Sequence, residues 1–145
     1  MAERRAPSTR DAYKAFVELT TRWSDNDVYG HMNNVVHYAL FDTAVNQWLI
    51  ERGALDIHKG EQIGLVVHTE CHYFAEMAFP DRVTAGLRAD RVGNSSVTYG
   101  VGLFRNDEEQ AAAEGQFTHV YVAREGRRPA PLNDDLRSAV EKIAA

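Results

Sequence analysis

Two carboxylates and several small polar residues stand directly before a long apolar segment, in the stretch SDNDVYGHMNN at residues 24–34. Asp25 and Asp27 lie two residues apart in this stretch. A carboxylate in such a loop can attack an acyl carbon or activate a water molecule. Gly30 lets the loop backbone approach a ligand closely and adopt angles that other residues avoid. The stretch therefore supplies one group that acyl transfer requires, an anionic nucleophile or base.

A second group, a site for a developing oxyanion, can come from the segment that follows. Residues 34–52 carry apolar side chains at steps of three and four, which predicts a helix. The side-chain oxygen of Asn33 or Asn34 can cap its start. The first-turn N–H groups then point outward at the positive end of the helix dipole, where they can stabilise negative charge. The same pattern also fits an ordinary turn and cap without a catalytic role.

The other elements are mostly strands. Alternation predicts one strand before the loop, over residues 13–23, and four after the helix, over residues 64–74, 82–92, 96–104 and 110–124. A short closing helix is expected over 132–143, capped by Asn133 or Asp134. Strands joined by short turns form an antiparallel sheet, and the long helix can cover one face of it. Val35 and Ile50 widen the apolar surface of that helix, which predicts burial on most sides. The predicted fold class is α+β.

Length, charge and cysteine content limit the class of protein. The 145 residues fit one domain, with a polar segment at 1–11 expected to be flexible and a single domain over 12–145. A net charge of -5 argues against nucleic acid as a partner. The only cysteine, Cys71, excludes an intrachain disulfide and suits the cytoplasm. No apolar run approaches the roughly 20 residues that cross a bilayer, so no membrane insertion is expected.

The loop and helix together resemble the signature of a known family. The pattern Asp25-x-Asp27-x-x-Gly30-His31-x-Asn33-Asn34-x-x-x-Tyr38-x-x-x-Asp42 is similar to that of the hotdog-fold acyl-CoA thioesterases, the 4-hydroxybenzoyl-CoA thioesterase-like group. Residues 72–81, 91–96 and 127–132 resemble later family segments in the same order. The resemblance implies a hotdog fold, a five-stranded antiparallel sheet wrapped around one long central helix, with a short C-terminal helix.

The resemblance also implies roles for individual residues. Asp27 matches the catalytic carboxylate, as nucleophile or as general base. The backbone N–H of Asn34 matches the amide that polarises the thioester carbonyl. His31 stands where many relatives have an aliphatic residue, and could orient Asp27, bind water or serve only the loop structure. Asp25 is expected to shape the loop. Further residues near the substrate are expected to be Gly30, Asn33, Tyr38 and Asp42.

The implied reaction is hydrolysis of an acyl-CoA thioester to a free acid and coenzyme A, without a metal or another cofactor. Residues expected to contact the coenzyme are Ser95, Ser96, Arg91 and Arg128. Hotdog subunits pair edge to edge, which implies a homodimer, assembled into a homotetramer, with sites between subunits. Two alternatives remain: a non-catalytic acyl-CoA-binding module, and a thioesterase or dehydratase acting on acyl carrier protein. The dehydratases carry a Glu on the long helix and a His-Phe-Pro type loop, and this loop is absent from the sequence.

His68-Thr69-Glu70-Cys71-His72 suggests a metal site or a thiol nucleophile. The spacing differs from the zinc-protease pattern, in which Glu follows the first His directly on a helix. On a strand His68 and His72 would share a face about 13 Å apart, too far for one ion. A strand position also favours Cys71 as a small core residue.

Overall fold

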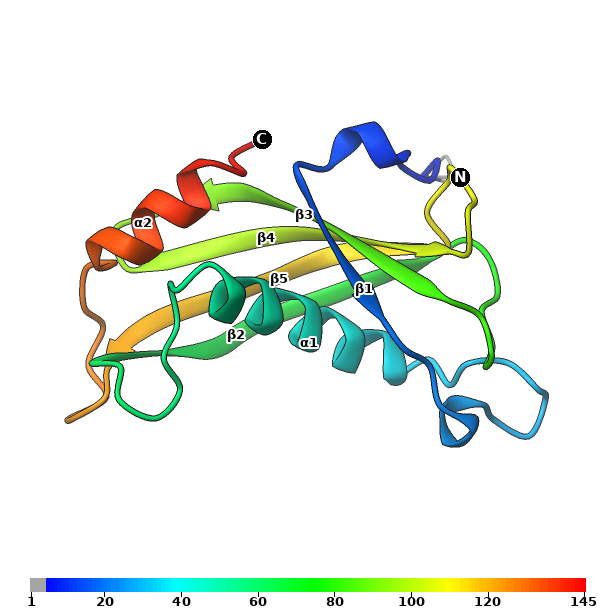
Figure 1. Cartoon of the computed structure of the whole chain (residues 1–145), viewed down its shortest axis with the longest axis horizontal. Coiled ribbons are helices and arrows are strands. Elements are labelled where there is room, and N and C mark those ends of the chain that lie inside the picture. The colour runs from blue at the N-terminus through cyan, green and yellow to red at the C-terminus, as the bar shows by residue number, and fades with distance from the viewer. Residues whose placement is uncertain (1–4) are drawn as a thin grey trace.

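The computed structural model describes residues 5–145 and forms one antiparallel sheet with a long helix against one face (Figure 1). The strands are β1 (Ala15–Leu19), β2 (Gln62–Tyr73), β3 (Val83–Val92), β4 (Ser96–Arg105) and β5 (Ala113–Ala123), in the spatial order β1-β3-β4-β5-β2. The helices are α1 (Val36–Glu51) and α2 (Asp134–Glu141), with short 3-10 helices at Arg10–Ala12 and Trp23–Asp25. No helix within residues 5–145 has the length and apolar character needed to cross a bilayer.

The core lies between α1 and the sheet. Alternate residues of the central strands, such as Leu87 and Leu103, are fully buried and belong to the same apolar cluster as Phe41 of α1. This alternation follows from the strand geometry, in which successive side chains point to opposite faces. At Gly115 an added Cβ would lie 1.9 Å from the carbonyl oxygen of Glu70, so only glycine fits there.

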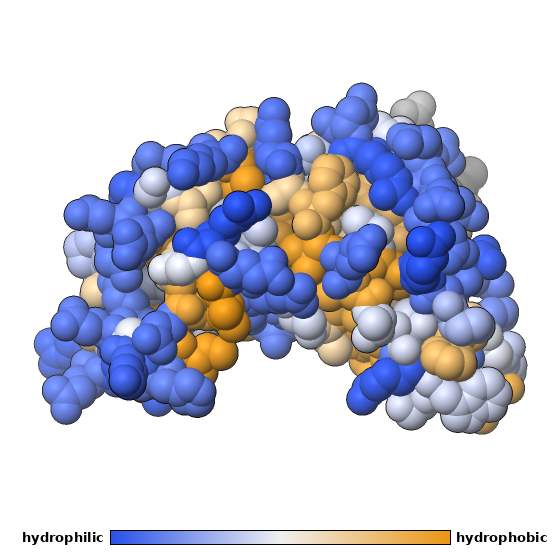
Figure 2. All heavy atoms as spheres, in the orientation of Figure 1, coloured by the Kyte–Doolittle hydropathy of each residue, from blue (hydrophilic) through white to orange (hydrophobic). Residues whose placement is uncertain are grey.

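One face of α1 is not covered. Phe41 and Leu49 are fully buried, whereas Val35 is 62% exposed and Ile50 is 45% exposed. The prediction that α1 is buried on most sides is therefore wrong for the single chain. Figure 2 looks onto this side of the molecule and shows apolar surface between hydrophilic side chains.

The first strand is shorter than predicted. β1 ends at Leu19, and Trp23 belongs to a 3-10 helix with its side chain 78% exposed. The physical cause is Asp25, whose carboxylate accepts hydrogen bonds from the backbone N–H and the guanidinium of Arg22 and turns the chain back. β5 likewise begins at Ala113 rather than at residue 110.

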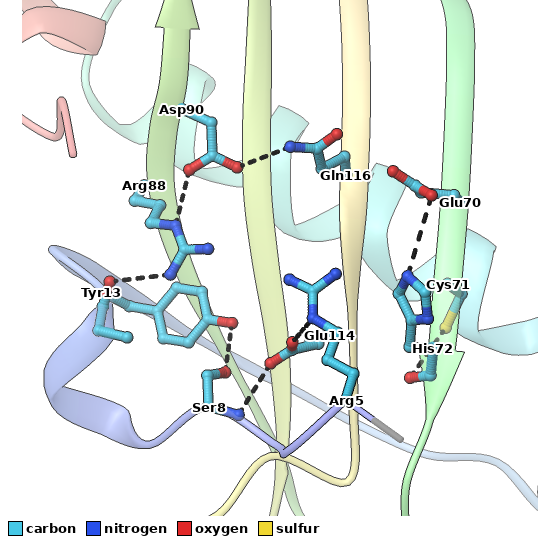
Figure 3. Close-up of polar contacts among 11 residues, drawn as sticks. Arg5, Ser8, Tyr13, Glu70, Cys71, His72, Arg88, Asp90, Glu114 and Gln116 are labelled. Carbon is cyan, nitrogen blue, oxygen red and sulfur yellow. Dashed lines mark hydrogen bonds and ion pairs between the residues drawn. The ribbon is translucent and has the colours of Figure 1, made fainter. Parts of the chain in front are cut away.

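Part of the N-terminal segment is attached to the sheet. Residues 1–4 of the segment expected to be flexible lie outside the described residues. From Ser8 on the chain differs from that expectation. The Ser8 N–H donates to Glu114 at 2.9 Å (Figure 3), and the Ala111 N–H donates to the Ser8 carbonyl at 2.9 Å. The Ser8 hydroxyl also lies 2.8 Å from that of Tyr13.

The two outer strands of the sheet are β1 and β2. β2 pairs with β5 along its whole length and leaves its other edge open. Leu65, Val66 and Val67 on β2 are 38%, 49% and 59% exposed. An open edge with exposed apolar residues is a favourable surface for pairing with another strand.

Candidate active site

Asp27 organises a tight turn before α1. Its N–H donates to the His31 carbonyl at 2.7 Å, and its carbonyl accepts the Gly30 N–H at 3.1 Å. Its carboxylate oxygen Oδ1 accepts the N–H groups of Tyr29 at 2.8 Å and His31 at 3.3 Å. Gly30 has φ +81°, a backbone conformation that favours glycine. The second oxygen, Oδ2, has no hydrogen-bond partner among residues 5–145, so half of this partly buried carboxylate remains available.

Asp25 and Asn26 fix this turn to the rest of the chain. Asp25 is 2% exposed, and its carbonyl accepts the Asn33 N–H at 2.8 Å. The side chain of Asn26 accepts the Phe79 N–H at 2.9 Å, and the Met32 N–H donates to the carbonyl of Met77 at 2.7 Å. These contacts agree with the expectation that Asp25 shapes the loop. They hold the turn against the segment that connects β2 and β3.

The start of α1 leaves one amide without an acceptor. Asn33 supports the turn that leads into α1, because its side-chain oxygen accepts the Val35 N–H at 3.1 Å and its carbonyl accepts the Val36 N–H at 2.9 Å. The N-cap residue of the helix is Val35, which has no side-chain cap, so the prediction that Asn33 or Asn34 occupies the cap position is wrong. The N–H groups of Met32 and Asn33 are also paired. Within the described part of the chain, the N–H of Asn34 has no acceptor. The start of the helix therefore presents one unpaired donor in a row of paired ones.

This donor belongs to a residue that lines a cavity of about 250 Å³ beside the turn. The wall is formed by the end of the loop, the first turn of α1 and the residues after β2, namely His31, Met32, Asn34, His37, Tyr73, Phe74, Ala75, Glu76 and Met77. His31 Nε2 lies 2.9 Å from Glu76 Oε2. The His31 side chain therefore pairs with Glu76, and only the backbone of His31 contacts Asp27. Asp27 itself does not belong to the wall of this cavity in the single chain.

His37 is a cavity residue that the sequence reasoning missed. It is 4% exposed, and its Nδ1 is buried without a hydrogen-bond partner among the described residues. Burial lowers the pKa of His37, although the nearby carbonyls of Asn34 and Asn33 act in the opposite direction. The imidazole is therefore neutral at pH 7. Its position three residues after Asn34 on a helix was the available signal, because residues at that spacing share one face.

Tyr73, at the end of β2, holds the start of α1. Its hydroxyl donates to the carbonyl of Asn34 at 2.7 Å, and its ring lies edge-on to His37 with centroids 4.7 Å apart. Burial raises the pKa of Tyr73, with smaller contributions from Cys71 and Tyr38, so the hydroxyl keeps its proton. Because this contact joins residues 39 positions apart in the sequence, no local pattern could predict it.

The remaining predicted site residues lie elsewhere in the single chain. Tyr38 is half-buried and packs edge-on against Phe41, and Asp42 is exposed and accepts a hydrogen bond from Asn46. The residues expected to contact the coenzyme are at the β3–β4 turn and after β5, namely Ser95, Ser96, Arg91 and Arg128. Figure 1 places that end of the sheet opposite to the loop before α1. One chain therefore does not bring the two groups together.

The His-Cys segment of β2 forms no second centre. His68 and His72 both approach Glu70, at 3.7 and 3.9 Å, and Figure 3 shows His72 turned toward that carboxylate. Residues 5–145 contain no group of three or more His, Cys, Asp or Glu side chains placed to hold a metal ion. Burial raises the pKa of the Cys71 thiol to about 11, which keeps it protonated and poorly nucleophilic at neutral pH.

The fold, the loop and the cavity beside the unpaired amide agree with one family. The chain belongs to the thioesterase-like superfamily, whose family model matches residues 21–140 and so covers the loop, α1 and β2 to β5. The predicted resemblance and the predicted hotdog fold, with its five-stranded sheet and long helix, are confirmed by this match and by the solved structures below.

Three solved structures illustrate the similarity. The PA5185 protein of Pseudomonas aeruginosa strain PAO1 is 51% identical, with 96% of this chain and 97% of that chain covered and a TM-score of 0.93. A thioesterase of Thermus thermophilus, complexed with coenzyme A and Zn, is 27% identical over 90% of this chain and 95% of its own, with a TM-score of 0.72. A 1,4-dihydroxy-2-naphthoyl-CoA thioesterase from Synechocystis shares the fold at 21% identity, 86% and 93% coverage and a TM-score of 0.77.

Proposed function

We propose that this chain is an acyl-CoA thioesterase that hydrolyses its substrate to a carboxylic acid and coenzyme A. The observation that carries the proposal is the unpaired N–H of Asn34 on a cavity wall, next to the turn built around Asp27. A thioester carbonyl that accepts this N–H becomes more electrophilic, and the same N–H stabilises the oxyanion that forms on attack. The dipole of α1 acts in the same direction.

Asp27 supplies the attacking group or the base. Its Oδ1 is held by two backbone N–H groups, and Oδ2 is left for chemistry. In one route Oδ2 attacks the carbonyl carbon, the thiolate leaves, and water hydrolyses the resulting anhydride. In the other route Oδ2 takes a proton from a water molecule that attacks the same carbon. Both routes consume one water and release the acid and the thiol.

The acyl group has an apolar wall available to it. Met32, Phe74 and Met77 line the cavity together with the neutral His37. The Nδ1 of His37 is buried without a hydrogen-bond partner among the described residues, behind this part of the wall. Water is the only co-reactant of the proposed hydrolysis, which therefore includes no metal or redox cofactor. A cytoplasmic location stays a prediction that rests on the single cysteine.

The complete site is proposed to lie between two subunits. Antiparallel pairing of β2 with β2 of a second chain would bury the exposed Leu65, Val66 and Val67. A two-fold axis across that edge sets the loop before α1 of one chain beside the opposite sheet end of its partner. That end carries Arg128 after β5 and Ser95 in the β3–β4 turn, and Arg91 near the end of β3 and Ser96 at the start of β4 flank the same turn. The proposal includes a homodimer, assembled further into a homotetramer.

Replacing Asp27 by Asn tests the chemistry. Asn retains an Oδ1 that can accept the Tyr29 and His31 N–H groups, so the turn should persist while the charge is lost. We expect kcat to fall by about 10² to 10⁴-fold in a thiol-release assay with a panel of acyl-CoA substrates. Asp107→Asn, which removes a carboxylate 94% exposed, is the matched control and should leave kcat unchanged.

Wild-type turnover in a correctly folded Asp27→Asn variant would remove Asp27 from the mechanism. The same assay distinguishes the alternatives, because an acyl-CoA-binding module would bind the panel without releasing thiol. A carrier-protein enzyme would act on acyl carrier protein and leave the acyl-CoA panel intact.

A further inference from the structure

A second cavity lies at the other end of α1, between the last turn of that helix, the residues leading into β1, and α2. Its volume is about 500 Å³, within the usual range for small-molecule sites. In Figure 2, which faces this side of the molecule, apolar surface is visible between hydrophilic side chains. The cavity shares no residue with the wall that contains Asn34.

The charges around this cavity are unbalanced. Lys14, Arg52 and Lys142 line it, against a single carboxylate, Asp135. None of the three cationic side chains forms an ion pair with a described residue. A nearby carboxylate, that of Glu141, is already paired with Arg137 at 3.6 Å. The cavity therefore combines three positive charges with one negative charge in a chain of net charge -5.

The cations are not needed to cap α1. The carbonyl of Trp48 accepts the Arg52 N–H at 3.0 Å, that of Ile50 accepts the Gly53 N–H at 3.0 Å, and that of Leu49 accepts the Ala54 N–H at 2.9 Å. Backbone donors thus satisfy three of the last four carbonyls of the helix, and the side-chain donors of the cations remain available.

Trp48 provides a second, independent indication of a ligand. It lines the cavity, is 3% exposed, and its Nε1–H is buried with no acceptor among residues 5–145. A buried donor without an acceptor costs about 1–3 kcal/mol, so this end of α1 carries an unmet polar group beside the cavity. Its ring also offers an apolar surface beside the charges.

We propose that this cavity binds an organic phosphate, with the phosphate held by Lys14, Arg52 and Lys142 and the organic part packed against Trp48. A phosphate monoester carries a charge of about -1.5 to -2 and three acceptor oxygens, which suits an excess of two positive charges. Ser138, also at the cavity, adds one more donor. The phosphate can belong to a free metabolite or to the coenzyme A of the substrate.

Binding in this cavity can be followed by the fluorescence of Trp48, which lines it. The chain has two tryptophans, so Trp23→Phe leaves Trp48 as the only reporter. Phenyl phosphate, titrated into this variant, should change the Trp48 fluorescence saturably, and phenol should not. Adding K14Q, R52Q and K142Q should weaken the binding of phenyl phosphate by about tenfold or more, which corresponds to 1.4 kcal/mol. A control that removes three exposed cations elsewhere, K59Q with R82Q and R127Q, should change it less than about twofold.

Absence of saturable binding, or equal affinity in the two triple variants, would overturn the proposal. Should the cavity variant fail to fold, Ser138→Asp, at an exposed position, tests it by adding a negative charge and should abolish binding; retained binding counts against the site. Steady-state kinetics with acyl-CoA then identify the source of the phosphate. This part of the test rests on the proposed function. A raised KM for acyl-CoA in the cavity variant assigns the site to coenzyme A, and an unchanged KM assigns it to a separate ligand.

Discussion

Acidification should destabilise this fold through His119 on β5, and replacing that residue by Phe should remove the effect. His119 is 3% exposed, with its Nδ1 3.1 Å from the hydroxyl of Tyr121, which in turn lies 2.8 Å from the hydroxyl of Tyr99. The ring of Phe117 lies edge-on to the imidazole at 4.7 Å. Burial lowers the pKa of His119 from 6.5 to about 4, because the imidazolium would lose its water.

Proton linkage gives the sign and the size of the effect of His119 on the free energy of unfolding. Above pH 6.5 the imidazole is neutral in both states and carries no penalty. Below pH 6.5 the unfolded chain takes up a proton that the native chain refuses until about pH 4, so stability is lost as the pH falls between these values. A shift of this size corresponds to about 3 kcal/mol in full, and to about 2 kcal/mol between pH 7.5 and pH 5.0. That is a large part of a typical total of about 5–15 kcal/mol.

The contribution of His119 to the pH dependence of stability can be measured by urea unfolding. Wild type and His119→Phe are compared at pH 7.5 and pH 5.0, at one protein concentration. The difference between the two pH values should be about 2 kcal/mol larger for wild type than for the variant. Other titrating groups, including His37, whose pKa burial also lowers, are present in both proteins and cancel. Any packing cost of the larger ring cancels in the same way. A difference below about 0.5 kcal/mol would refute the reasoning.

Three further predictions concern the site and its assembly. Tyr73→Phe removes the hydrogen bond to the carbonyl of Asn34 and should lower kcat/KM about fivefold, whereas Tyr29→Phe, whose side chain is 81% exposed, should not. Gly30→Ala should cost about 1 kcal/mol in urea unfolding and reduce kcat, because φ is +81° there; unchanged stability would contradict the conformation. Val67→Lys should give a smaller oligomer than wild type in sedimentation velocity, with loss of turnover, and an unchanged oligomer would exclude β2 as an interface.

Much of the fold could be predicted from the sequence because the patterns that indicate its elements are local. The spacing of Phe41, Val45 and Trp48 indicated α1. Asn133 or Asp134 was predicted to cap α2, and the structure shows that Asn133 does so, accepting the Leu136 N–H at 2.9 Å. Both signals depend on residues three or four positions apart, which backbone geometry brings together without tertiary contacts. The end of β1 was misjudged, since alternation continues to Trp23 although Asp25 turns the chain back earlier.

The sequence by itself determined the order of the elements, the family and the polar loop, because periodicity and motif spacing are properties of a continuous segment. Only the tertiary structure decided how the loop and the start of α1 are held. It brought the Tyr73 hydroxyl of β2 onto the carbonyl of Asn34, and it fixed the loop to the residues after β2 through Asn26 and Met32. It also placed Trp48 of α1 and Lys142, which follows α2, on the wall of one cavity. Such contacts join residues far apart in the chain, and they exist only once the sheet and α1 have packed together.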